Sequence, residues 1–228
     1  MVNKMYKDKK TDKPIPTWNP FKGCDFNCVY CEPSFKRQAK RQKHRCYECY
    51  TYKPHFHPER LNKIPKGDLI FACANGDISF ASNEIIEKIF DAIKTKPNQD
   101  FLLQTKNPKC LINKEIPDNV IVGTTIETNY GTFTISSAPS PEVRIFDLWL
   151  IEHERKFVTH EPILKFDLDT LVKWDRKSNL EMVWVGYANH TKGMKNLVEP
   201  ELSKVKELIK ELESFTDVRL KTIREKQG

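Results

Sequence analysis

The sequence has no long hydrophobic run. No stretch approaches the roughly 18 consecutive apolar residues that a membrane span requires, so we expect no membrane partner. Residues 1–13 are charged and polar, and a signal peptide is not expected there. Gly/Ser-rich linkers and internal repeats are also absent, so nothing divides the 228 residues into separate folding units. A chain of this length can bury a real core as one domain, which we expect to be cytoplasmic.

The chain has only a moderate excess of positive charge. Its 38 Lys and Arg against 31 Asp and Glu give a net charge of +7, which permits a polyanionic partner without requiring one. The stronger feature is local, because one short segment contains Lys36, Arg37, Lys40, Arg41, Lys43 and Arg45. This basic segment can bind the phosphates of DNA or RNA, and it can equally be a solvated helix face. The sequence leaves both interpretations open.

The cysteines are few, odd in number and clustered toward the N-terminus. In a cytosolic protein, where thiols stay reduced, clustered cysteines indicate metal binding rather than disulfides. The tightest cluster is a C-x3-C-x2-C motif within TWNPFKGCDFNCVYC, formed by Cys24, Cys28 and Cys31. Proline, glycine, aspartate and asparagine residues interrupt this stretch and predict a tight loop.

Three thiolates at such short spacing can converge on one inorganic centre. A structural zinc ion takes four protein ligands, and so does a fully ligated cluster of four irons and four sulfides. Three cysteines therefore leave one iron without a protein ligand, and an open position is where a substrate or co-substrate binds. The alternative interpretation is a zinc knuckle or a set of separate structural thiols.

A second group of metal-binding side chains follows. Cys46 and Cys49 form a C-x2-C pair, and His55 and His57 come shortly afterwards. Such a set can close a zinc site or hold a second cluster. However, the His-x-His step is shorter than the usual zinc-finger spacing, and we expect the flanking prolines to hold the two rings apart. The sequence leaves a second metal open.

The rest of the chain alternates between strand and helix patterns. Continuous apolar runs of strand length are typical of strands buried on both faces of a parallel sheet. The strands are expected at residues 15–21, 68–74, 101–105, 120–126, 157–159, 182–187 and 218–223. The helices are expected at residues 34–44, after Ser82, from Ser140, at 167–174 and at 200–214. In the helix after Ser140, periodicity predicts a core face of Val143, Phe146 and Leu150.

About six strand and helix repeats predict right-handed crossovers and a parallel sheet. We therefore expect an α/β fold, a partial (β/α)6 TIM-like barrel with outer helices and an open side. Residues 1–16 are expected to form a flexible N-terminal arm, and residues 17–228 one barrel domain. Within that domain, the basic Cys/His/Tyr-rich segment at about 34–66 is an insertion.

Polar residues follow the predicted strands. In parallel barrels the chemistry lies at the carboxyl ends of the strands, where the loops converge. Any single residue there is more often a solvated loop residue or a helix cap, but the agreement of several on one rim predicts a site. They are Asn75, Gly76, Asp77 and Ser79, then Thr105 and Lys106, Thr125, Glu127 and Asn129, His160 and Glu161, and Asn189 and His190.

The cysteine loop, with Tyr30 just before its third cysteine, resembles the signature loop of the radical S-adenosylmethionine (SAM) superfamily. Its TWNP lead-in resembles a phage- and prokaryote-associated family, and the blocks LLQTKNP, GTTIETN, THEPIL and WVGYANH extend this match over most of residues 17–190. The cysteine spacing is also similar to that of the spore photoproduct lyases. The resemblance implies a [4Fe–4S] cluster on Cys24, Cys28 and Cys31, with SAM at the open iron.

The resemblance also implies SAM contacts. Asn75, Gly76 and Asp77 stand where the superfamily has a glycine-rich turn that holds the methionine amino group, with Asp77 in place of the usual glutamate. Residues 125–129, with Thr125, Glu127 and Asn129, stand where the ribose hydroxyls are held. The adenine commonly lies at the position of Gly186 and Tyr187. The implied cofactor-binding set is completed by Thr105, Lys106 and Glu161.

The implied activity is reductive cleavage of SAM to a 5′-deoxyadenosyl radical, which abstracts hydrogen from a substrate. The electron donor would be a reductase such as flavodoxin or ferredoxin, and the basic segment indicates nucleic acid or a nucleotide as the substrate. Cys73 is either a small buried residue or, as in spore photoproduct lyase, a thiol that returns hydrogen to a product radical. The alternative function is a non-catalytic zinc protein that docks on nucleic acid.

Overall fold

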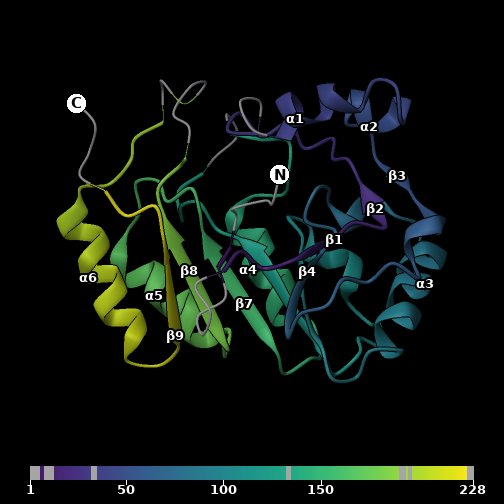
Figure 1. Ribbon diagram of the computed structural model, residues 1–228. Helices are drawn as coiled ribbons and strands as arrows, with labels where there is room; N and C mark the ends of the chain where they lie inside the picture. Colours follow the sequence, from purple (N-terminus) through teal and green to yellow (C-terminus); the bar gives the residue numbers. More distant parts are fainter. Residues whose placement is uncertain are drawn as a thin grey trace.

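The computed structural model describes residues 6–7, 13–31, 35–131, 135–189, 194 and 197–224. A seven-stranded sheet lies at its centre, in the order β1-β4-β5-β6-β7-β8-β9, and every neighbouring pair is parallel. The strands are β1 (Thr17–Trp18), β4 (Leu69–Ala72), β5 (Asp100–Gln104), β6 (Val120–Thr125), β7 (Lys156–His160), β8 (Met182–Gly186) and β9 (Asp217–Lys221). β1 and β9 lie at its two edges, so the curved sheet is open on one side (Figure 1). This confirms the predicted partial barrel.

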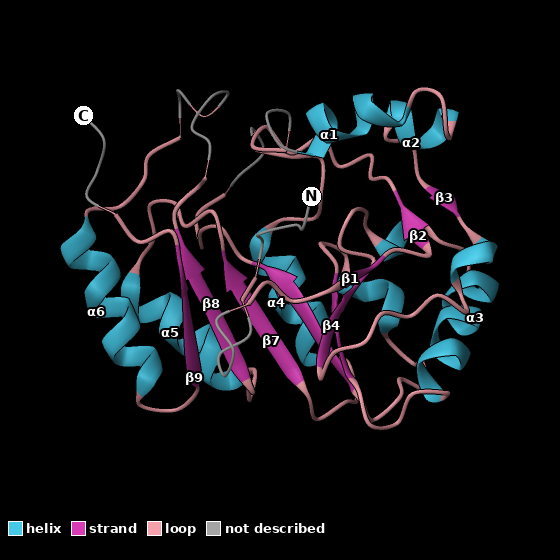
Figure 2. Cartoon of the chain, viewed as in Figure 1, coloured by secondary structure: helices cyan, strands magenta, loops and turns pink. Residues whose placement is uncertain are grey.

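Amphipathic helices cover one face of this sheet (Figure 2). They are α3 (Asn83–Lys94), α4 (Pro141–Trp149), α5 (Leu168–Lys177) and α6 (Leu202–Glu213). The side chains of Ser82, Ser140 and Asp167 accept hydrogen bonds from the first turns of α3, α4 and α5. The crossover from β5 to β6 contains a short 3-10 turn instead, η5 (Pro108–Leu111). None of the helices described here combines the length and apolar character that a membrane crossing needs.

The α4 helix is rotated from its predicted orientation. The expected core face is exposed, by 46, 45 and 63 % for Val143, Phe146 and Leu150. The buried face consists of Pro141, Arg144, Ile145 and Leu148. Arg144 causes the difference, because its guanidinium points to the sheet and pairs with the buried carboxylate of Glu127. Ile145 and Leu148 lie on the same side of the helix and are buried with it.

The N-terminal arm packs onto the other face of the sheet. Tyr6 and Ile15 are buried, and the backbone N–H of Ile15 donates to the carbonyl of Tyr6. The Tyr6 ring lies 4.4 Å from the Trp184 ring and 5.2 Å from the Phe71 ring, measured between centroids. Its hydroxyl donates to Gln104 Oε1 at 2.9 Å. The expectation of a flexible arm is therefore wrong for these residues, because Tyr6 and Ile15 complete an apolar layer inside the half-barrel.

Short elements fill the segment between β1 and β4. They are β2 (Phe21–Lys22), α1 (Arg37–Ala39), η2 (Lys40–Gln42), α2 (Tyr47–Thr51), β3 (His55–Phe56) and η3 (Pro58–Arg60). β2 and β3 pair antiparallel, and α1 and α2 lie beyond one end of the sheet, at the top of Figure 1. The predicted helix at 34–44 is present as short helical pieces from residue 35, and Ser34 lies outside the described residues. Its basic side chains are mostly exposed.

Candidate functional site

A cavity of about 800 Å³ opens where the parallel strands end. Its walls come from the cysteine loop, from the turns after β4, β5 and β7, and from the ends of β6 and β9. Part of the predicted rim therefore lines one cavity, but Ser79, Asn129 and His160 do not, and His160 is fully buried against Asp175. The sequence-predicted residues that line the cavity are Cys24, Cys28, Cys31, Gly76, Asp77, Thr105, Lys106, Thr125, Glu161 and Asn189.

The cysteine loop is held by backbone hydrogen bonds to two other segments. The N–H of Gly23 donates to the carbonyl of Asn75 at 3.0 Å, and the N–H of Asp77 donates to the carbonyl of Gly23 at 3.0 Å. The N–H of Cys24 donates to the carbonyl of Tyr52 at 3.2 Å. The turn after β4 and the insertion therefore hold the loop from two sides.

Two glycines permit this close packing. A Cβ atom on Gly76 would lie 2.8 Å from both the nitrogen and the oxygen of Gly23. A Cβ atom on Gly23 would lie 2.0 Å from the carbonyl oxygen of Lys53, and the backbone there has a φ of +87°. Larger residues at either position would push the cysteine loop away from its supports.

The three thiols fit an iron–sulfur cluster. Burial raises the pKa of Cys24 to about 12. The hydrogen bond between Cys31 and Cys28 lowers the pKa of Cys28 to about 6 and raises the pKa of Cys31 well above its usual range. Lys106 favours the Cys28 thiolate as well, and thiolates are the metal-binding form. All three cysteines line the same cavity. A cube of four irons and four sulfides is wider than one ion and uses such thiolates.

A buried charge network lies directly behind the loop. The Tyr30 hydroxyl donates to Glu127 Oε1 at 2.5 Å, and Lys106 Nζ donates to both of them. Arg144 lies 2.9 Å from Glu127 Oε2 and also donates to the carbonyl of Thr125. Burial would raise the pKa of Glu127, but Arg144 and Lys106 hold it well below its usual range. Tyr30, the residue before the third cysteine, is therefore hydrogen-bonded to the ionised carboxylate of Glu127 below the cavity.

Asp77 joins the turn after β4 to the end of β5. Its Oδ1 accepts hydrogen bonds from Thr105 Oγ1 at 2.6 Å and from the N–H of Ser79 at 3.0 Å. Its Oδ2 accepts from the N–H of Lys106 at 2.8 Å. The carboxylate is thus fixed at the cavity wall, where it can still accept a hydrogen bond from a bound amino group. Its predicted contact with SAM stays a prediction.

Other predicted site residues lie outside the cavity lining. Glu127 is buried beneath it, Asn129 exchanges two hydrogen bonds with the backbone of Asp167, and Tyr187 donates to the carbonyl of Pro200. Cys73 is buried in the core between the sheet and its helices. Asn75 and Gly186 contribute backbone contacts to Gly23 and β9. His190 lies outside the described residues.

Several lining residues were missed in the sequence. Tyr6, Gln104, Trp184 and Lys221 all face the cavity. Gln104 donates to Thr125 Oγ1 at 2.6 Å, and Lys221 forms an ion pair with the buried Glu161. Burial raises the pKa of Glu161, and Lys221 opposes this rise. For Gln104 and Trp184 the available signal was alternation along β5 and β8, which is weak in strands buried on both faces, and Tyr6 lies in no strand.

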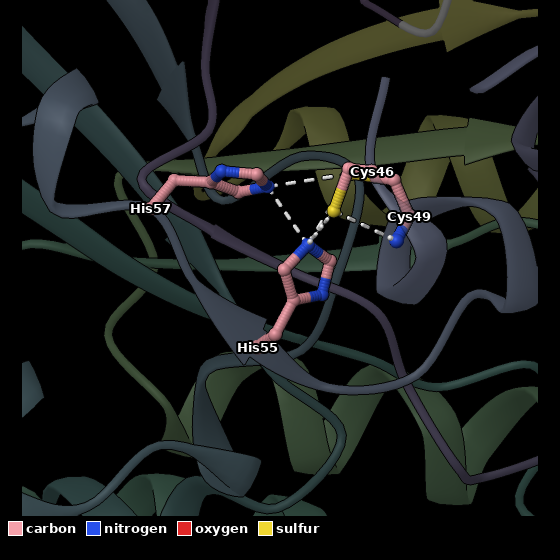
Figure 3. Close-up of side chains that lie close together, drawn as sticks. All are labelled: Cys46, Cys49, His55 and His57. Atoms are coloured by element: carbon pink, nitrogen blue, oxygen red, sulfur yellow. Dashed lines mark hydrogen bonds between the residues drawn. The ribbon is translucent and has the colours of Figure 1, made fainter. Parts of the chain in front are cut away.

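The second metal-binding group is also assembled. Cys46 and Cys49 lie at the start of α2, and His55 and His57 lie in and just after β3. Figure 3 shows the four side chains turned toward one another, and their ligand atoms all lie within 4.8 Å. The expectation that prolines hold the rings apart is wrong, because the ring centroids are 4.5 Å apart. Both rings face α2, because Cys49 Sγ lies 3.2 Å from His55 Nε2 and 3.3 Å from His57 Nε2.

Solved structures with a similar fold have low sequence identity. A spore photoproduct lyase variant with bound AdoMet and dinucleoside spore photoproduct matches with a TM-score of 0.62 at 11% identity, over 89% of this chain and 75% of that one. A further variant of that enzyme gives 0.66 at 11% identity, over 96% and 81%. SuiB of Streptococcus suis bound to precursor peptide SuiA gives 0.54 at 10% identity, over 90% and 49%. At sequence identities of 10 to 11%, these matches show a similar fold and nothing more.

Sequence comparison gives a family but no function. Residues 10–187 match the family described as "Protein of unknown function (DUF5131)". No curated protein matches the chain in sequence. The matched residues include the cysteine loop, the group of Cys46, Cys49, His55 and His57, and the strands up to β8.

Proposed function

This chain belongs to the DUF5131 family, and we propose that it is a radical SAM enzyme. In this proposal Cys24, Cys28 and Cys31 hold a [4Fe–4S] cluster, and SAM binds at the iron that no cysteine ligates. The observation that carries it is the convergence of three thiols on one cavity at the carboxyl ends of the parallel strands. When bound, the cluster supplies the electron that cleaves SAM to methionine and a 5′-deoxyadenosyl radical.

The residues of the chain have positioning roles in this reaction. Asp77 offers a fixed carboxylate to the methionine amino group, and Thr105 and Lys106 orient that carboxylate through their hydrogen bonds. Tyr30, Lys106 and Glu127 hold the cysteine loop from behind. Tyr6 and Trp184 form an apolar wall of the cavity, which excludes water from the reacting atoms. Thr125 and Glu161 present polar atoms on the remaining side.

For the substrate we propose nucleic acid or a nucleotide. The basic segment is exposed near the cysteine loop, and a structural relative was solved with a dinucleoside photoproduct. A flavodoxin or ferredoxin in the cytoplasm would supply the electron. Cys73 is not proposed as the hydrogen donor, since it is buried in the core away from the cavity lining. A purely zinc-binding role gives no function to the cavity beside the three thiols.

The test is anaerobic reconstitution of the full chain with iron and sulfide. We expect about four iron atoms and four sulfides per chain, and release of 5′-deoxyadenosine when SAM and dithionite are added. The Cys28→Ala variant should lose both the cluster and the product. The Cys110→Ala variant is the matched control, because Cys110 does not line the cavity, and it should retain both.

Two outcomes would contradict the proposal. One is wild-type protein that binds no iron–sulfur cluster under these conditions. The other is a Cys28→Ala variant that forms 5′-deoxyadenosine as fast as the wild type.

A further inference from the structure

The side chains of Cys46, Cys49, His55 and His57 form a compact donor set outside the cavity (Figure 3). Cys49 Sγ lies 3.2 Å from His55 Nε2 and 3.3 Å from His57 Nε2, and Cys46 Sγ lies 3.5 Å from His55 Nε2. The two Nε2 atoms are 2.7 Å apart. We propose that this set binds one structural zinc ion, which fastens the insertion to the barrel.

The outer hydrogen bonds of the two histidines fix their tautomers. His55 Nδ1 lies 2.7 Å from the carbonyl oxygen of Lys53, and His57 Nδ1 lies 2.9 Å from Glu59 Oε1. Both partners are acceptors, so each Nδ1 carries the proton and each Nε2 presents a lone pair. A proton on one Nε2 or a metal ion beside both relieves the repulsion between these lone pairs, and the two cysteine sulfurs within 3.5 Å complete a metal donor set. A histidine that donates to a carbonyl or carboxylate in this way is typical of a metal ligand.

The sulfur–nitrogen distances fit one ion and not a cluster, whereas the two Nε2 atoms, 2.7 Å apart, would separate by about half an ångström when zinc binds. Zinc bonds of about 2.3 Å to sulfur and 2.0 Å to nitrogen place tetrahedral ligands roughly 3.3 to 3.8 Å apart. The observed sulfur–nitrogen distances of 3.2 to 3.5 Å fall close to this range, and all four ligand atoms lie within 4.8 Å. A two-iron centre would separate the cysteine pair from the histidine pair by the width of a second metal. Two thiolates and two imidazoles are a common zinc set, and four protein ligands make a closed, structural site.

The two short elements that carry the four ligands bury few side chains of their own. α2 has five residues, of which Cys49 is buried, and β3 has two residues. Elements this short bury too little apolar surface to fold stably alone, and small folds of this kind are often stabilised by a bound metal ion. Zinc would join the first turn of α2 to β3 and would thereby fix the intervening residues.

Those intervening residues support the cysteine loop. The carbonyl of Tyr52 accepts the hydrogen bond of Cys24 N–H, and Lys22 of β2 pairs with His55 of β3. Zinc binding should therefore stabilise the loop that holds Cys24. This last step rests on the proposed function, whereas the zinc site itself does not.

The zinc site is tested by metal analysis of the full chain purified without added metal. We expect about one zinc per chain in the wild type and in Cys24→Ala, and loss of zinc in the double variant Cys46→Ser/His57→Asn. Retention of zinc by Cys24→Ala separates this site from the iron site. Wild-type protein without zinc that also fails to take up zinc on addition would overturn the proposal, as would full zinc in the double variant.

Two further measurements avoid dependence on variants that fail to fold. Wild-type protein loaded with Co²⁺ should show the intense visible bands of a tetrahedral site and a thiolate charge-transfer band, and weak octahedral bands would overturn the assignment. Glu59→Gln should weaken zinc affinity about 10- to 100-fold in competition with a chromophoric chelator. The control Glu84→Gln, at an exposed carboxylate on α3, should leave the affinity unchanged. Equal affinities in the two variants would contradict the role of Glu59.

The effect of zinc binding on the cysteine loop is measured by the iron content of the protein. After reconstitution, Cys46→Ser/His57→Asn should hold several-fold less iron than Cys110→Ser. If the zinc site exists and the proposed function is wrong, wild-type protein will contain zinc and no iron–sulfur cluster. If only the effect of zinc on the loop is absent, the double variant will lose zinc and keep its full iron content.

Discussion

Glu127 is the residue on which the buried side of the cavity depends. Its carboxylate is almost fully buried and contacts Tyr30, Lys106 and Arg144. A buried ion pair adds little net stability compared with apolar packing, but removal of one partner leaves the other charge buried and unpaired. Arg144 would be left in this way, since its exposed fraction is 1 %.

We therefore expect Glu127→Gln to lower the free energy of unfolding by about 3–5 kcal/mol. The measurement is chemical denaturation of the full chain, monitored by circular dichroism. The control is Glu84→Gln, which removes an exposed carboxylate that pairs with Lys88 along α3, and its midpoint should barely move. Equal midpoints for Glu127→Gln and the wild type would show that Arg144 finds another partner.

Some residues of the candidate site could be predicted from the sequence, and others could not. The rim residues Asp77, Thr105 and Thr125 could be predicted, because polar residues directly after apolar strands fall at one end of a parallel sheet. Trp184 could not, because β8 is buried on both faces and its sequence does not distinguish them. Arg144 was missed because a charged residue in an amphipathic helix ordinarily faces water.

At the scale of elements, the cysteine loop and the turn after β4 behave as one unit. Gly23 and Gly76 approach as closely as backbones allow, and two hydrogen bonds join Gly23 to Asn75 and Asp77. The position of the cysteines therefore depends on a turn about fifty residues away in the chain. No side chain larger than a hydrogen atom fits between the two segments.

Gly76→Ala should displace the loop, because the new Cβ would meet backbone atoms of Gly23. We expect a loss of about 1–3 kcal/mol in stability, typical of overpacking, and a lower iron content after reconstitution. Denaturation and iron analysis measure the two effects. The control Asn113→Ala strains a residue with a φ of 59° away from the loop, and it should lose stability without losing iron. An iron content in Gly76→Ala equal to that of the wild type would contradict this account.

The elements differed in how well the sequence predicted them. Most of the parallel strands could be read from continuous apolar runs, and α3 and α6 from their helical periodicity. The insertion could not be read, since its pieces are too short to show a period. Its geometry is set by long-range contacts instead, such as the β2–β3 pairing that brings His55 and His57 together.

At the scale of the whole molecule, the seven strands form a half-barrel with a cavity at one end. The proposed function predicts that SAM binds there only when the cluster is in place. A ligand that binds the native state alone adds stability by mass action, about 2.7 kcal/mol at a concentration 100 times its Kd. SAM should therefore stabilise iron-loaded protein much more than iron-free protein.

Anaerobic denaturation of the same wild-type chain, with and without iron, tests this expectation without any substitution. The iron-free protein serves as the control, and S-adenosylhomocysteine, which lacks the sulfonium charge, serves as a second ligand for comparison. A SAM-dependent shift of equal size in both protein forms would mean that the ligand does not use the open iron.

The Tyr6 contacts have a consequence for the depth at which chemistry can occur. Tyr6 packs against Trp184 with its ring tilted by 39°, donates a hydrogen bond to Gln104 and thereby fills part of the hollow of the half-barrel. The rings of Tyr6 and Trp184 therefore limit how deep a reactant can enter the cavity. Under the proposed function, the radical would thus act close to the surface, and a bulky target would need to insert only the group that reacts.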